Sequence, residues 1–329
     1  MKKTVLASVI AGIAFSGQAF AVELYNSGGS TFSVGGHISM GVGNDPVDDD
    51  LEVQSISPRV NINATQDIGG GFTADAKGEW ALNTLNGGEE SFKTRLGYVG
   101  VTHDTWGRVV GGTQWSPYYD VAGIADMPIA FANDFLYVQG GELGTARAES
   151  MVSYRKTFMF GDNLDLNLGA GWQGDNGGYG DRGQLGLSFD LGEIYVGYVF
   201  STGSQAGTSD DAMANTLSAK YGSYGDGLFV AVVYEIGDKF RNATGGPAYD
   251  STSVEAIAAF ALANSLNFSL NYESHEDDDN SVTVISQMAL QVEYNFTPAF
   301  VGYAGYQLDL GDDVSSDDDL YALGVRYYL

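Results

Sequence analysis

A period of two, repeated along almost the whole chain, is the strongest constraint in this sequence. In residues 266–273, leucine, phenylalanine and tyrosine occupy every second position, with asparagine, serine and glutamate between them. Successive side chains of a β-strand point to opposite faces, so such a segment forms a strand with one apolar and one polar face. About 16 segments of roughly 9–13 residues follow this pattern. They start near Thr31, Val53, Gly71, Phe92, Gly107, Ala148, Leu164, Asp181, Glu193, Asn215, Gly227, Ser251, Leu266, Val284, Ala299 and Leu320.

The connections between these segments alternate in length. Residues 223–226 and 297–298 are short turns, whereas residues 202–214 and 237–250 are long and polar. Short turns on one rim and long loops on the other are typical of an up-and-down membrane barrel. We therefore expect an all-β fold: a closed antiparallel transmembrane β-barrel of about 16 strands, with short periplasmic turns and long extracellular loops. A soluble β-sandwich or barrel is the alternative, because alternation does not show which face points inward.

The first residues have the features of an export signal. Lys2 and Lys3 precede a short apolar run, which ends at Ala19-Phe20-Ala21. This order is typical of a secretory signal peptide, and the run of about a dozen residues is shorter than the roughly 20 that a spanning helix needs. We expect a signal peptide over residues 1–21, cleaved after Ala21, followed by one barrel domain over residues 22–329. The chain has no cysteine, which excludes a small disulfide scaffold.

Charge restricts the partners of the chain. Its 15 lysine and arginine residues face 42 aspartate and glutamate residues, which gives a net charge of −27. Removal of the signal peptide makes the mature chain more acidic still. Binding of nucleic acid needs the opposite sign, so a nucleic-acid partner is excluded. Strong acidity instead raises the local concentration of cations.

One connection, residues 115–147, differs from all the others. At about 33 residues it exceeds the usual length of a structureless loop. It also contains many aromatic side chains, whose exposure to water would be unfavourable. We expect this third long loop to fold into the barrel and narrow the channel, since a barrel of about 16 strands otherwise leaves a wide lumen.

Several motifs together carry a family resemblance. They are the N-terminal Val22-Glu23-Leu24-Tyr25-Asn26, residues 93–100 (KTRLGYVG) and the stretch over residues 119–134. In order and spacing they resemble the trimeric general porins of Gram-negative bacteria, especially those of marine gammaproteobacteria, over the whole mature chain. The resemblance implies a homotrimer in the outer membrane, in contact with lipid and lipopolysaccharide. It also implies a water-filled pore for small hydrophilic solutes and ions, which reaches the outer membrane by export through the periplasm.

The resemblance further implies acidic residues on the constriction loop. Carried over by position, these are Asp126 and Asp134, with Asp120 as a weaker candidate nearby. A further family glutamate falls at Ala130, which departs from the family pattern.

Opposite these acids the family places a row of basic residues on the barrel wall. That row maps onto Arg59, Arg95 and Arg147, with Lys93 alongside. A family lysine falls at His37, a second departure. Alternation independently predicts that Arg59, Arg147 and His37 face the lumen.

Opposed acidic and basic rows would create a field across the waist of the pore, and charged rings of this kind set selectivity. The departure at Ala130 weakens the attraction of cations, and the departure at His37 weakens the attraction of anions. Because these two changes roughly cancel, we expect the overall acidity to produce a modest cation preference that fades as salt shortens the Debye length.

Other functions follow from other features. Trp115, Tyr118 and Tyr119 could stack on sugar rings, so a substrate-specific porin for oligosaccharides is the closest alternative. A purely structural barrel or an adhesin would carry no stable current. An enzyme is not expected: the three histidines are scattered, and neither a Gly-x-Ser-x-Gly motif nor a cysteine is present.

Four acidic runs lie in long loops. They cover residues 48–50, 276–279, 312–313 and 317–319. A solvated outer surface is one interpretation. The other is Ca²⁺ or Mg²⁺ bridging these loops to each other or to lipopolysaccharide, since hard cations prefer oxygen ligands. No EF-hand spacing is present, and we expect no other metal site or cofactor.

Overall fold

The computed structural model describes residues 21–44, 50–87, 92–161, 163–176, 179–204, 211–242, 247–263, 265–311 and 319–329. The signal peptide predicted over residues 1–21 therefore lies, except for Ala21, outside the described residues. Within these ranges the strands are β1 (Val22–Ser27), β2 (Ser30–Asn44), β3 (Leu51–Gln54), β4 (Arg59–Gly69), β5 (Phe72–Leu82), β6 (Phe92–His103), β7 (Gly107–Trp115), β8 (Arg147–Met159), β9 (Asp165–Gln173), β10 (Arg182–Leu191), β11 (Ile194–Ser204), β12 (Asp211–Ser223), β13 (Asp226–Asn242), β14 (Ala248–Ala261), β15 (Leu266–Asp277), β16 (Val282–Thr297), β17 (Phe300–Asp309) and β18 (Leu320–Tyr328). The helical elements of the same ranges are α1 (Pro117–Ala122) and the 3-10 turns η1 (Gly123–Ala125) and η2 (Phe135–Tyr137).

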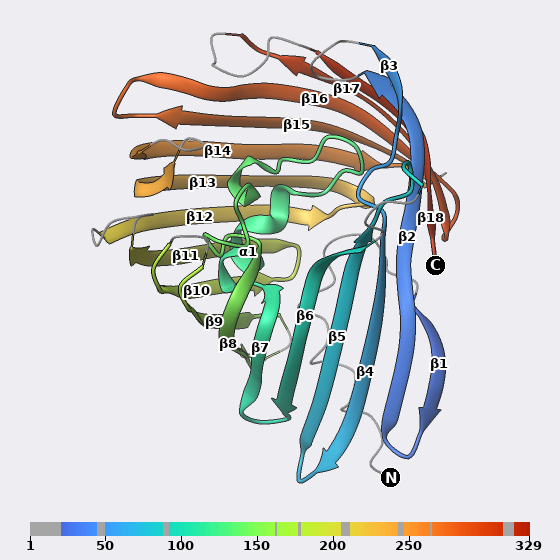
Figure 1. The fold of residues 1–329 in the computed structure, drawn as a ribbon, viewed down its shortest axis with the longest axis vertical. Helices are drawn as coiled ribbons and strands as arrows, with labels where there is room; N and C mark the ends of the chain where they lie inside the picture. The colour runs from blue at the N-terminus through green and yellow to red at the C-terminus, as the bar shows by residue number, and fades with distance from the viewer. Residues whose placement is uncertain are drawn as a thin grey trace.

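These eighteen strands form one antiparallel sheet and occupy sixteen positions in it. β1 and β18 share one edge of β2, where β1 pairs with its first half and β18 with its second half. On the other edge of β2, β4 pairs with the first half and β3 with the second half. The pairing of β18 with β2 closes the ring, as Figure 1 shows. The predicted closed antiparallel barrel of about 16 strands is confirmed, and its closed sheet has no edge to expose to lipid.

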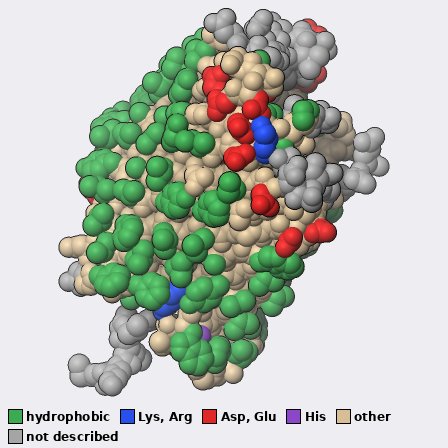
Figure 2. Space-filling model, turned by 90° about the vertical axis from the view of Figure 1, so that its left-hand side faces the viewer, with side chains coloured by type: hydrophobic (Ala, Val, Ile, Leu, Met, Phe, Trp, Pro, Cys, Tyr) green, Lys and Arg blue, Asp and Glu red, His purple; other side chains and the backbone are tan. Residues whose placement is uncertain are grey.

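The outer face of the barrel is apolar, and β13 shows the pattern clearly. Leu228, Val230 and Ile236 are 42–50% exposed, whereas Val233 and Glu235, which point inward, are 0% exposed. Hydrophobic side chains cover much of the outside in Figure 2, and acidic side chains gather towards the upper right of that view. A soluble barrel would bury its apolar face, so this surface fits lipid rather than water. In the described part of the chain, no helix has the length and apolar character needed to cross a membrane.

The long connection between β7 and β8, residues 116–146, folds into the lumen as predicted, and we call it L3 (Figure 1). Ser116 caps the N-terminus of helix α1, where its side chain accepts a hydrogen bond from the Tyr119 backbone N–H at 3.1 Å, and Pro117 is the first residue of the helix. The hydroxyl of Ser218 on β12 donates to the Val121 carbonyl at 2.7 Å. Apolar side chains of L3, including Leu136, pack with inward-facing residues of β11, β13 and β14. L3 therefore lies against one side of the barrel wall, which leaves the other side uncovered.

Candidate functional site

Basic residues of the uncovered wall share one level of the sheet. His37 of β2 pairs with Arg59 of β4, Arg59 pairs with Ala81 of β5, and Ala81 pairs with Lys93 of β6. Directly paired residues of neighbouring strands point to the same face. His37, Arg59 and Lys93 therefore belong to one rung of the wall, with the small Ala81 between the two cations.

Arg95 reaches the lumen through a β-bulge. Glu79 pairs with Leu96 and Trp80 pairs with Thr94, so Arg95 is the extra residue of β6. Without the bulge, simple alternation would place Arg95 on the outer face with Val99, which is 61% exposed. The bulge reverses the alternation, and the Arg95 Nε donates to Glu79 Oε1 at 2.9 Å.

Glu79 is an acid within this basic wall that sequence reasoning missed. Its side chain is 5% exposed. Its carboxylate lies 2.9 Å from Arg95 Nε, 3.7 Å from Arg59 Nη1 and 3.9 Å from Lys77 Nζ. Glu79 pairs with Asn61 on the polar face of β4, but this pairing depends on the strand register, which the sequence does not show.

Arg326 of β18 is a second residue that the sequence analysis did not select. Its Nε donates to Ser39 Oγ at 2.8 Å and its Nη2 to the Ile56 carbonyl at 3.2 Å. It interacts electrostatically with His37 and Arg59. The strand pattern held the signal, because Arg326 is the polar position between two apolar ones. We call Arg59, Arg95, Arg147 and Arg326 the basic row.

Arg147 joins the basic row from β8. Its Cζ lies 5.6 Å from the centroid of the Trp115 ring, and it interacts electrostatically with Arg95 and Asp126. Gly112 pairs with Met151 and Gln114 with Ala148, so β8 holds an extra residue near Ser150, whose φ is +52°. This bulge breaks the alternation that predicted the direction of Arg147, although the residue does face the same lumen as Arg95.

Asp126 faces the basic row from L3. Its Oδ2 accepts a hydrogen bond from the Tyr119 hydroxyl at 2.7 Å, and it interacts with Arg59 and Arg147. Among the described residues no ion pair joins Asp126 to an arginine, so the opposite charges face each other across a gap. Confinement in the lumen raises the pKa of the Asp126 carboxyl to about 6, against the effect of the Tyr119 hydrogen bond and the two arginines.

The other two predicted loop acids have different surroundings. Asp134 is exposed, its backbone N–H donates to Glu273 Oε2 at 3.0 Å, and it interacts electrostatically with two other acids, Asp126 and Glu273. Asp120 lies on α1, and its Oδ2 accepts from Arg155 Nε at 2.5 Å. That ion pair ties α1 to β8 and turns Asp120 away from the basic row.

The three aromatic residues predicted to contact solutes also differ in their surroundings. Tyr118 is 0% exposed, and its hydroxyl donates to Glu235, so the prediction of a solute contact is wrong for Tyr118. Trp115 and Tyr119 are half-buried and stack on each other with ring centroids 4.1 Å apart. They remain a partly exposed aromatic surface where β7 meets L3, with Trp115 beside Arg147.

Four glutamates of the wall hold L3 in place, and we call them the glutamate row: the buried Glu235 (β13), Glu255 (β14) and Glu273 (β15), and the half-buried Glu293 (β16). Their carboxyl groups accept hydrogen bonds from L3: from the Tyr118 hydroxyl, the Leu136 N–H at 3.2 Å, the Asp134 N–H at 3.0 Å and the Ile129 N–H at 2.8 Å. Alternation had marked the glutamates of β15 and β16 as polar-face residues, but nothing in the sequence linked them to L3.

Within the glutamate row, Glu235 has a cationic partner. Arg241 Nη2 lies 2.8 Å from Glu235 Oε1, and both side chains are almost fully buried. Thr216 Oγ1 also donates to Glu235 at 2.8 Å. Arg241 and Thr216 thus compensate the buried negative charge of Glu235, which accepts the hydrogen bond from Tyr118.

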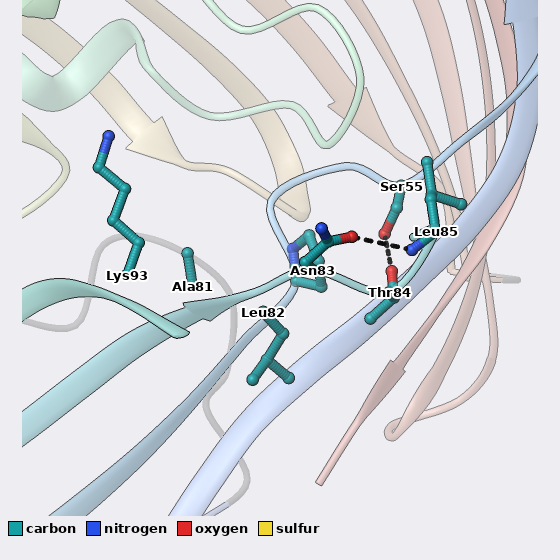
Figure 3. Close-up of a pocket in the computed structure, with 8 residues that line it drawn as sticks. Ser55, Ala81, Leu82, Asn83, Thr84, Leu85 and Lys93 are labelled. Atoms are coloured by element: carbon teal, nitrogen blue, oxygen red, sulfur yellow. Dashed lines mark hydrogen bonds between the residues drawn. The ribbon is translucent and has the colours of Figure 1, made fainter. Parts of the chain in front are cut away.

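An open pocket of about 290 Å³ lies at the start of β6 (Figure 3). Lys93 lines it, together with Ser55, Thr84 and Asn83. Ser55 and Thr84 hydroxyls share a hydrogen bond of 2.7 Å, and the amine of Lys93 points away from them. Lys93 is exposed and lies at the edge of the basic row rather than inside it.

The acidic loop runs provide no preformed metal cage where they are described. In the part of the chain that the structure covers, no group of three or more His, Asp or Glu residues is placed to hold a metal ion. In the run over residues 276–279, Asp279 pairs with Lys239, which also lies 3.1 Å from Asp250. Residues 48–49, 312–313 and 317–318 lie outside the described residues. Bridging by Ca²⁺ or Mg²⁺ stays a prediction.

Comparison with known proteins agrees with this wall and lumen. The Gram-negative porin family matches residues 5–329. The chain belongs to the Gram-negative porins. It is 27% identical to the outer membrane porin PhoE of Escherichia coli, with 99% of each chain covered. The family makes this protein an outer-membrane pore and not an enzyme.

Solved structures give the same fold. Salmonella typhi OmpF, in complex with daunomycin, matches with a TM-score of 0.78 and 19% identity, over 94% of this chain and 100% of that one. An anion-selective porin from Comamonas acidovorans matches with a TM-score of 0.68 and 16% identity, over 91% and 100%. Since a neighbour of the same fold is anion-selective, the fold does not decide which ions this porin prefers.

Glu235→Gln should destabilise the barrel, because it leaves the Arg241 guanidinium buried without a charged partner. Breaking a buried ion pair costs about 3–5 kcal/mol. We expect a lower temperature for loss of the heat-resistant folded form on gels, and noisier single-channel current as L3 loosens. Lys239→Gln is the control, since that rim ion pair is partly exposed and worth less than about 1 kcal/mol. Equal losses in both variants would contradict the anchoring role of Glu235.

Proposed function

We propose that this porin is a general diffusion pore for small hydrophilic solutes and ions, with a mild preference for cations, and that it acts as a homotrimer. L3 would form its constriction, with Asp126 opposite the basic row. The resemblance to trimeric porins supports the assembly. Among the small outward residues of β5, Ala74 and Ala76 would allow close approach of a neighbour, whereas the Trp80 ring folds over Gly78.

The position of Glu79 is the observation that carries the ion preference. A wall of uncompensated arginines would concentrate anions, but the Glu79 carboxylate lies within 4 Å of Arg59 and Arg95. Its charge cancels part of the basic row at the place where ions would pass. Asp126 adds negative charge on the opposite side of the gap. With the local charges so offset, the net charge of −27 favours cations at the mouth and in the lumen.

Reversal potentials across planar bilayers in a dilute salt gradient test this preference. We expect the wild type to favour cations mildly, and Glu79→Gln and Asp126→Asn each to lower the cation-to-anion permeability ratio. Arg95→Ala should raise that ratio. All of these differences should shrink in about 1 M salt, where the Debye length falls to about 3 Å.

Glu149→Gln is the matched control for these charge changes. Glu149 is exposed and bonds Asn176 away from the basic row, so its loss should leave the permeability ratio almost unchanged. An anion preference of the wild type in the dilute gradient would overturn the proposal. So would a Glu79→Gln variant that is no less cation-selective than the wild type.

The cation preference should also depend on pH. The Asp126 carboxyl has a pKa raised to about 6, so it is negative above this pH and becomes neutral as the pH falls through it. We therefore expect the permeability ratio to fall between about pH 7 and pH 5, the range within one unit of that midpoint. Asp126→Asn should show no such step. A step of the same size in this variant would assign the titration to another group.

The stacked pair Trp115–Tyr119 favours one alternative function, a pore selective for oligosaccharides. Two half-buried rings beside Arg147 form a surface on which a sugar ring could pack. If this is their role, one sugar of a series should block the current in proportion to its concentration, and Trp115→Ala should relieve the block. A general diffusion pore predicts no such block by any sugar, and we expect that result.

A further inference from the structure

Glu255 of β14 occupies an unusual position in the glutamate row. Its side chain is 1% exposed, and its Oε1 accepts the Leu136 backbone N–H at 3.2 Å. Its Oε2 lies 3.1 Å from the Tyr137 hydroxyl oxygen. In the register of the two strands, Glu255 stands directly opposite Glu273 of β15. Two buried carboxyl groups therefore face the same segment of L3 from neighbouring strands.

The contact between Tyr137 and Glu255 needs a hydrogen atom that an ionised Glu255 does not have. The Tyr137 hydroxyl has a single hydrogen, and its oxygen lies 2.8 Å from the Ala122 carbonyl as well as 3.1 Å from Glu255. The Ala122 carbonyl can only accept, so the phenol hydrogen belongs to that shorter contact. The contact with Glu255 is then a hydrogen bond only if the Glu255 carboxyl donates. Burial raises the pKa of Tyr137 well above its ordinary value, so the phenol keeps its hydrogen.

We propose that Glu255 is held as a neutral carboxylic acid and donates to Tyr137, which donates to the Ala122 carbonyl, so that one proton fixes the position of L3. Ala122 ends α1 in the first limb of L3, and Tyr137 ends η2 in the second limb. The chain of donors therefore joins both limbs of the loop to β14. Glu255 acts as a positioning residue, because it touches no permeating ion and works through the loop.

The charges around Glu255 agree with a neutral acid. Glu273 stands opposite, and Asp126 of L3 adds a second negative charge within interaction range. Arg241 is the cation that interacts with Glu255, but its guanidinium is paired with Glu235 at 2.8 Å. Like charges that share a buried site are unfavourable when both are ionised.

The other titratable groups near Glu255 have hydrogen-bond partners of their own or add further negative charge. Tyr118 of L3 donates to Glu235. His275 of β15 lies beside Phe135, and its ring nitrogens bond the hydroxyls of Ser253 at 2.7 Å and Tyr249 at 3.0 Å. Asp134 of L3 is near Glu273 and adds a further negative charge. Loss of the Glu255 proton to water at alkaline pH would place a second carboxylate opposite Glu273 and leave Tyr137 with two acceptors for one hydrogen.

Single-channel recording over a range of alkaline pH tests this inference. In the wild type we expect current fluctuations from a loosened L3 to become more populated as the pH rises, by about tenfold for each pH unit above the midpoint, as the release of one proton requires. Glu255→Gln keeps a neutral donor at the same place and should stay quiet across the whole range. A slope in Glu255→Gln equal to that of the wild type would overturn the proposal.

Infrared spectroscopy of the purified porin gives a readout that does not depend on ion preference, so it can fail separately from the proposed function. At neutral pH the C=O stretch of protonated carboxyl groups should be stronger in the wild type than in Glu255→Gln, by the intensity of one carboxyl group. An unchanged band intensity in Glu255→Gln, or a loss of this intensity in Glu273→Gln alone, would place the proton elsewhere and overturn the inference. Glu149→Gln, an exposed control, should leave the band unchanged.

Tyr137→Phe serves if Glu255→Gln does not fold. It removes the phenol but keeps the carboxyl group, so the protonated C=O band should persist at a shifted frequency, and the current should fluctuate more at every pH. An unshifted band would show that the Glu255 carboxyl does not donate to Tyr137, and the proposal would fail.

Discussion

Closure of the sheet is the constraint on which the rest of this structure depends. A backbone N–H or C=O without a partner costs several kcal/mol in hydrocarbon, so the barrel cannot keep an open edge. β18 and β1 together complete one edge of β2, where Val22 pairs with Val34 and the Leu329 N–H donates to the Gly36 carbonyl at 2.9 Å. The first and last strands of the barrel thus share one strand position, and the wall holds together through its own backbone.

Because the wall is self-sufficient, the lumen does not have to be a packed core. L3 fills one side of it with a small core that includes Tyr118, Val121 and Leu136. The polar groups that this packing buries are matched by side chains of the wall, since the glutamate row receives the N–H and O–H groups of L3. The opposite side keeps its arginines uncovered, and the asymmetry gives the pore one acidic and one basic side.

The sequence predicted the strands well, because lipid outside and water inside impose a period of two on every strand. It did not separate β1, nor divide β3 from β4, since their shared positions follow from pairing along β2 rather than from pattern. Alternation does not predict side-chain direction across two β-bulges. At the bulge in β6 it would turn Arg95 towards lipid, and at the bulge near Ser150 in β8 the inward and outward positions exchange. Register, which a single sequence does not reveal, places Glu79 beside Arg59 and Arg95 and places Arg326 beside Ser39, and the burial of Tyr118 depends on the path of L3.

Stability and selectivity act on the same charges in this wall. Arg59, Arg95, Arg147 and Arg326 repel one another at short range, and the low dielectric of a narrow lumen strengthens that repulsion. Glu79 relieves the repulsion because it lies between Arg59 and Arg95. The same carboxylate also weakens the attraction of the wall for anions. In the function proposed for this pore, an acid that allows several arginines to share one wall would also move the pore towards cations, so neither property could be changed at Glu79 without the other.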